Sequence, residues 1–108
     1  MSLIDEELIR EQFDYLDAET AARLLTALDD DLGRWGDRLM AAWDSGDEEA
    51  LRLARHAIRG VCSNFGASSL WEMAETDLRS APAREIYLAL QGATVEAIRR
   101  IAAEAIAD

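Results

Sequence analysis

The sequence predicts an all-α fold: an antiparallel four-helix bundle with a short additional N-terminal helix. Half of the 108 residues are apolar, and only one proline interrupts the chain. Alanine and leucine are abundant, and no segment alternates between apolar and polar residues with the period of two that is typical of strands. The length suits one hydrophobic core, so we expect residues 1–108 to form a single domain.

Apolar residues at helical spacing predict five helices. Their approximate ranges are 4–16, 18–43, 48–65, 68–79 and 83–107. Asp17 and Asp47 are suited to cap the N-termini of the second and third helices, and Gly46 is suited to end the second. Ser69 and Glu72 fit a capping box in the fourth helix. The short connections favour antiparallel packing of the four longer helices.

Charge and apolar run lengths argue against several classes of protein. A net charge of −11 disfavours nucleic acid, which is bound through lysine and arginine. No run of about 18 apolar residues is present, and the acidic N-terminus does not resemble a signal peptide, so we expect a cytoplasmic protein that does not bind membranes. The single cysteine, Cys62, excludes a disulfide framework and suggests a buried, reduced thiol.

Two further features concern the origin of the chain. All eleven basic residues are arginine, which together with the abundance of alanine indicates a GC-rich bacterial gene. The chain begins with methionine, so we expect a free-standing domain.

The third predicted helix carries the only histidine, His56. Four apolar residues share one face of this helix: Ala54, Ile58, Val61 and Phe65. At about 100° per residue, His56 lies on the opposite side, so we expect its imidazole to face solvent. The residues expected beside it on that side are Arg52, Arg59, Gly60 and Ser63.

The surroundings of this histidine are free of acidic residues. Residues 50–71 contain Arg52, Arg55 and Arg59 but no aspartate or glutamate, although the chain has 22 acidic residues. This window predicts a locally positive surface, which suits a dianionic phosphoryl group or an acidic pocket of a partner.

The same segment contains a spaced motif, formed by His56, Ile58, Gly60, Gly66, Ala67 and Leu70. It resembles the motif of the histidine-containing phosphotransfer (HPt) domains of bacterial phosphorelays, which reads approximately H-x-[LI]-K-G, five residues, then G-A-x-x-L. Arg59 stands where the family usually has lysine. The predicted helices also have the expected order, so the resemblance covers nearly the whole chain.

The resemblance implies a phosphocarrier without ATP-binding or autokinase activity, and therefore not an enzyme. His56 would accept the phosphoryl group, Arg59 would contact it and Gly60 would leave clearance for a partner. Further candidate binding residues are Arg52, Arg55 and Ser63. The implied partners are response-regulator receiver domains, which would supply Mg²⁺, and a hybrid histidine kinase. The carrier would need no cofactor of its own, and we expect a monomer.

Two other functions stay open. A non-catalytic adaptor would bind a receiver or another signalling protein without being phosphorylated, and would tolerate loss of the imidazole. A dimeric bundle of the histidine-kinase type is disfavoured because the chain has no ATP-binding domain. One histidine and one cysteine cannot build the usual zinc site. The consecutive acids Asp29, Asp30 and Asp31 point in different directions on a helix, so they do not predict a metal site.

Overall fold

The computed structural model describes residues 3–107, which form five α-helices and no strand. The helices are α1 (Glu6–Phe13), α2 (Ala18–Ser45), α3 (Glu48–Ser63), α4 (Ser68–Ala74) and α5 (Ala81–Ala107). The predicted all-α helical bundle is therefore confirmed. None of the described helices is long and apolar enough to cross a membrane.

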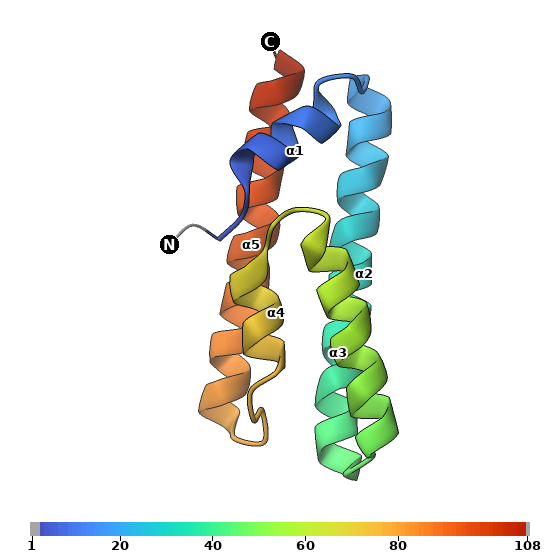
Figure 1. Cartoon of the computed structure of the whole chain (residues 1–108), viewed down its shortest axis with the longest axis vertical. Coiled ribbons are helices and arrows are strands. Elements are labelled where there is room, and N and C mark those ends of the chain that lie inside the picture. The colour runs from blue at the N-terminus through green and yellow to red at the C-terminus, as the bar shows by residue number, and fades with distance from the viewer. Residues whose placement is uncertain (1–2, 108) are drawn as a thin grey trace.

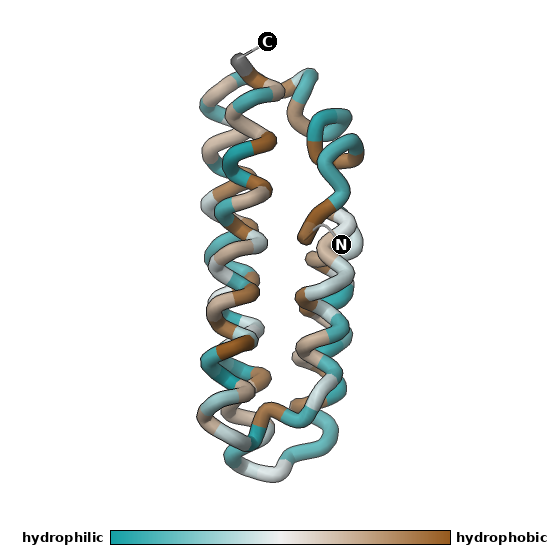
Figure 2. The backbone as a smooth tube through the Cα atoms, turned by 90° about the vertical axis from the view of Figure 1, so that its left-hand side faces the viewer, coloured by the Kyte–Doolittle hydropathy of each residue, from teal (hydrophilic) through white to brown (hydrophobic). Residues whose placement is uncertain are grey.

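The five helices lie in two layers. The long helices α2 and α5 form one layer, and α1, α3 and α4 form the other (Figure 2). Helix α2 packs on α3, α3 on α4, α4 on α5 and α5 on α2, so four helices close a ring at one end of the molecule (Figure 1). Successive helices in this ring run in opposite directions. At the other end α1 packs against α5, and the whole is 47 Å long.

Local capping sets several helix ends, as predicted. The Asp17 carboxylate accepts a hydrogen bond from the Thr20 amide at 2.7 Å, and the Asp47 carboxylate accepts one from the Ala50 amide at 3.0 Å. Each such cap stabilises a helix by about 1 kcal/mol. Gly46 ends α2 in the left-handed conformation, with a φ of 69°, and so turns the chain directly from α2 into α3.

The predicted bounds differ from the observed ones in every helix: α2 ends at Ser45 instead of near residue 43, and α3 ends at Ser63 instead of near residue 65. Helix α1 begins after residue 4 because Asp5 acts as its N-cap, and it ends at Phe13 instead of near residue 16. Helix α4 ends at Ala74 instead of near residue 79, and no side chain caps its N-terminus, so the capping box of Ser69 and Glu72 is wrong. Helix α5 begins two residues earlier than expected and runs through Gly92 without a break.

The core is apolar and continuous along the long axis. Its largest fully buried aliphatic and aromatic side chains are Ile9, Phe13, Leu32, Leu39, Ile58, Leu70, Leu78, Tyr87 and Ile98. These side chains come from every helix and from the connection between α4 and α5. Burial of each contributes about 1.5–3 kcal/mol, so the core holds α3 firmly in place and fixes the direction in which its outer face points.

Candidate functional site

Helix α3 presents His56 at the middle of its length. Its inner face buries Ala54, Ile58 and Cys62, which are at most 1% exposed. His56 lies on the opposite face and is exposed, as the spacing predicts. No hydrogen bond or ion pair joins the His56 side chain to any other residue of the described chain. The imidazole is therefore rigidly mounted on a packed helix but chemically free to react with a molecule from outside.

The space beside the histidine is open. Gly60 is exposed one turn after His56, and a Cβ placed on it would meet no atom within 4 Å. A glycine inside a helix lowers stability by about 1 kcal/mol relative to alanine. At position 60 no neighbouring group of the chain is close enough to exclude a side chain. The missing side chain leaves open space on the outer face of α3, one turn from His56.

The Arg59 guanidinium lies over an aromatic ring of the next helix. Its Cζ is 5.9 Å from the centroid of the Trp71 ring in α4. No carboxylate within residues 3–107 forms an ion pair with Arg59, and its side chain is exposed. The resemblance implies that this guanidinium contacts a phosphoryl group on His56; in the structure it lies over Trp71.

The Arg55 guanidinium is bound within the chain. Its Nε donates to the carbonyl oxygen of Ala74 at 3.0 Å, and its terminal nitrogen donates to the carbonyl oxygens of Glu75 and Thr76. Its Cζ also lies 5.5 Å from the centroid of the Trp43 ring. Arg55 therefore ties the end of α4 to α3 and α2, although the sequence placed it among the binding residues.

Two other predicted binding residues also have partners in their own helix. Arg52 donates to the Glu49 carboxylate, with its Nε at 3.2 Å, and this hydrogen bond lowers the pKa of Glu49. Ser63 donates from its hydroxyl to the carbonyl oxygen of Gly60 at 2.9 Å. Both side chains share the outer face of α3 with His56 and remain exposed. Of the three arginines in the acid-free window, only Arg59 is without such hydrogen bonds to the described chain.

An apolar groove lies beside this face, between α2 and α3. It has a volume of about 400 Å³, and its lining residues are Trp35, Arg38, Ala41, Ala42, Ser45, Ala50 and Leu53. Leu53 is 48% exposed and precedes His56 by one helical turn. Sequence reasoning missed this groove, because it depends on the register between two helices and has no local pattern.

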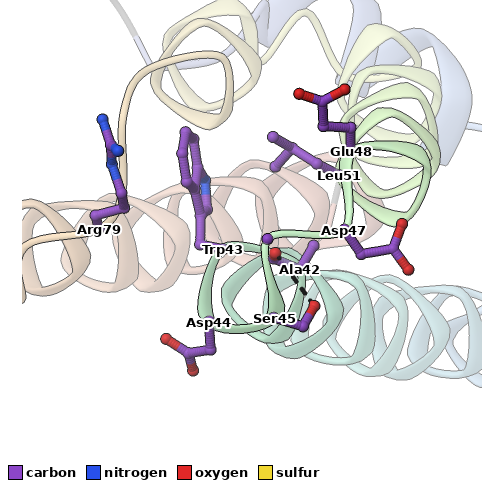
Figure 3. Close-up of a pocket in the computed structure, with 9 residues that line it drawn as sticks. Ala42, Trp43, Asp44, Ser45, Asp47, Glu48, Leu51 and Arg79 are labelled. Atoms are coloured by element: carbon purple, nitrogen blue, oxygen red, sulfur yellow. Dashed lines mark hydrogen bonds between the residues drawn. The ribbon is translucent and has the colours of Figure 1, made fainter.

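A second pocket of about 510 Å³ lies at the turn between α2 and α3, at the end of the bundle. Figure 3 shows the Trp43 ring standing between Arg79 and Leu51 on its wall. The Arg79 Cζ is 5.5 Å from the centroid of this ring. Arg79 also binds Asp77, and this hydrogen bond lowers the pKa of Asp77 to about 2. Two of the charged residues that line the pocket have partners outside it, since Arg79 binds Asp77 and Asp44 binds Arg84. His56 does not line the pocket.

Titratable groups elsewhere do not add a metal site or a reactive thiol. Within residues 3–107, no three histidine, cysteine, aspartate or glutamate side chains lie close enough to hold a metal ion. Cys62 is buried, and burial raises the pKa of its thiol to about 12. The chemistry available on the outer face of α3 is therefore that of one imidazole and one guanidinium.

Comparison of the chain with protein-family models, with curated proteins and with solved structures gives no match.

Proposed function

We propose that this chain is a histidine phosphocarrier of a two-component phosphorelay. The observation that carries the proposal is the exposed imidazole of His56, without a partner in the described chain, at the middle of a packed helix. Arg59 follows three residues later, and the space at Gly60 is open. The spaced motif that resembles the HPt domains supports the same function.

The proposed reaction needs few groups from this chain. The lone pair of the unprotonated ring nitrogen of His56 attacks the phosphorus of an aspartyl phosphate on a receiver domain. A nitrogen–phosphorus bond forms, the phosphorus–oxygen bond to the aspartyl group breaks, and its electron pair leaves with the carboxylate. Such transfer depends mainly on positioning and on neutralising charge. Arg59 supplies charge-assisted hydrogen bonds to the phosphoryl oxygens, and the receiver supplies its aspartate and Mg²⁺.

The surface around His56 is suited to a protein partner. The groove between α2 and α3 offers apolar surface as far as the exposed Leu53, which lies one helical turn before His56, although His56 itself does not line the groove. Exposed apolar area next to a reactive group favours docking of a folded domain over binding of a small ion. The carrier would act as a monomer in the bacterial cytoplasm, with receiver domains and a hybrid histidine kinase as partners.

The test is transfer of labelled phosphate from a phosphorylated receiver in the presence of Mg²⁺. We expect acid-labile, alkali-stable label on the wild-type chain and none on His56→Gln. Arg100→Gln, which removes an exposed arginine on α5 far along the chain, is the matched control and should be labelled like the wild type. Circular dichroism establishes that each variant is folded. Labelled ATP alone should give no label, because the proposed carrier takes its phosphoryl group from a receiver.

A non-catalytic adaptor is the second candidate, and the groove beside Leu53 favours it equally. An adaptor would bind receivers through the groove, and its affinity would survive loss of the imidazole. Binding of several receivers by the wild type and by His56→Gln, with no label on either, would make the adaptor the better assignment. A dimer in solution would favour the kinase-type bundle over both.

A further inference from the structure

The proposed site contains one contact that joins it to the neighbouring helix. Arg59 comes from α3 and Trp71 from α4, two helices that pack together in the ring (Figure 1). The Arg59 Cζ lies 5.9 Å from the centroid of the Trp71 ring, within the range of a cation–π interaction. Trp71 is only partly buried, so its ring is available at the surface next to α3.

Other arginines near this site are held by stronger contacts. Arg55 donates to three backbone carbonyl oxygens, and Arg52 donates twice to the Glu49 carboxylate. Arg59 has no such hydrogen bond or ion pair within the described chain. A single cation–π contact at an exposed site is weaker than a charge-assisted hydrogen bond to a phosphoryl oxygen. A phosphoryl group on His56 would therefore displace Trp71 as the partner of the guanidinium.

The geometry of α3 allows this exchange. Side chains on a helix lean toward its N-terminus, so residue 59 can reach over residue 56, three positions earlier. Gly60 has no side chain, and the space that a Cβ would occupy is empty, so the Arg59 guanidinium has room to move. The outer face of α3 carries no acidic residue between positions 50 and 63 that would capture the guanidinium on the way.

We propose that Trp71 is a positioning residue for the site: its ring holds the Arg59 guanidinium while His56 is free and releases it to the phosphoryl group once His56 is phosphorylated. The inference rests on the proposed phosphocarrier function. Trp71 then competes with the phosphoryl group for Arg59 and makes phospho-His56 a better donor. Removing the ring should shift the phosphoryl equilibrium toward His56 by about two- to fivefold, the size of one exposed cation–π contact.

The test uses the full chain labelled with fluorotryptophan and phosphorylated with phosphoramidate. In that reaction the His56 nitrogen attacks phosphorus and ammonia leaves, so no receiver is required. Phosphorus NMR reports phosphohistidine, and fluorine NMR reports the three tryptophans, assigned with single Trp→Phe variants. We expect the Trp71 resonance to move on phosphorylation, while the Trp35 resonance, on α2, stays in place. In Arg59→Gln the Trp71 resonance should not respond to phosphorylation.

The outcomes separate this inference from the proposed function. Phosphohistidine with an unmoved Trp71 resonance, or with an equal movement in Arg59→Gln, would overturn the role of Trp71 alone. Absence of phosphohistidine on the folded chain would overturn the phosphocarrier function, and the role of Trp71 with it. Partition of label between a receiver and the chain gives the second measurement. The Trp71→Leu variant should retain two- to fivefold more label on His56 than the wild type. The amount of label on Trp71→Phe should lie between these two values. An unchanged partition of label in both variants would contradict the inference.

Discussion

Asp5 packs directly against Gly66, at the turn between α3 and α4. The Asp5 amide donates to the carbonyl oxygen of Phe65 at 3.0 Å, and a Cβ on Gly66 would overlap the Asp5 Cβ and lie 3.0 Å from its backbone nitrogen. Gly66 also has a φ of 63°, in the left-handed region. The N-terminal segment therefore closes over the turn that follows the histidine helix, and only glycine fits there.

Replacing Gly66 with alanine should destabilise the chain strongly. Left-handed strain and overlap with the Asp5 Cβ add together, so we expect a loss of about 3 kcal/mol in the free energy of unfolding. Urea denaturation followed by circular dichroism measures it. Gly46→Ala is the matched control, because Gly46 has a φ of 69° but open space around it. It should lose only about 1 kcal/mol. Equal losses in the two variants would show that the contact with Asp5 contributes nothing.

Gly60→Ala should change stability and transfer in opposite directions. Its position is helical and open, so alanine should raise the free energy of unfolding by up to about 1 kcal/mol. The added methyl group stands one helical turn from His56, in the space through which a partner would approach, so we expect slower labelling from a phosphorylated receiver. Gly92→Ala, also helical and open on α5, should be stabilised in the same way without any change in labelling. A more stable Gly60→Ala that transfers at the wild-type rate would refute the clearance role of Gly60.

Local sequence signals predict the long helices, because their ends depend on neighbouring residues. Asp17 and Asp47 cap the N-termini of α2 and α3, and Gly46 ends α2, as their side-chain and backbone chemistry predicts. The end of α4 has no such signal. The carbonyl oxygens at and just beyond its C-terminus are satisfied by Arg55, which is 19 residues away from Ala74 in the sequence. A helix whose end is held by a distant side chain cannot be bounded from its own residues.

The outer face of α3 is predictable because it depends only on the local sequence of the helix. Periodicity alone places His56 and Arg59 on the exposed side, as the structure has them. The partners of the arginines are not predictable, because they depend on how α4 packs against α3. Arg59 meets Trp71 and Arg55 meets the end of α4 only after that packing is fixed.

Arg55→Gln tests whether this guanidinium supports the fold or stays free for the site. Three hydrogen bonds to backbone carbonyl oxygens are lost, and we expect the free energy of unfolding to fall by about 2 kcal/mol. The comparison is Arg52→Gln, which breaks an exposed pair with Glu49 and should leave the free energy of unfolding nearly unchanged. Urea denaturation of both variants decides the matter. If Arg55→Gln were as stable as the wild type, the Arg55 guanidinium would not support the fold and would again be a candidate for binding a phosphoryl group.

Cys62 should make the stability of the chain depend on pH in alkaline solution. Burial raises the pKa of this thiol from 9.0 to about 12 in the folded chain, whereas the unfolded chain ionises near the ordinary value. The unfolded state therefore loses its proton first as pH rises. The contribution of the buried Cys62 thiol to the free energy of unfolding is therefore fully present below about pH 9, and it is lost as the pH rises from about 9 to about 12.

The matched variant is Cys62→Ala, which keeps a small apolar side chain and removes the titrating group. At neutral pH the wild type should be more stable by about 1–2 kcal/mol, because alanine leaves a cavity. Above pH 9 this difference should shrink by up to about 1.4 kcal/mol per pH unit. Tyr87 is present in both proteins, so the rise of its pKa by burial is common to them, whereas the smaller rise caused by the charge of Cys62 is absent from Cys62→Ala. Urea denaturation at about pH 8 and about pH 10.5 tests the expectation. A difference that stays constant between these values would mean that the Cys62 thiol is not desolvated in the folded chain.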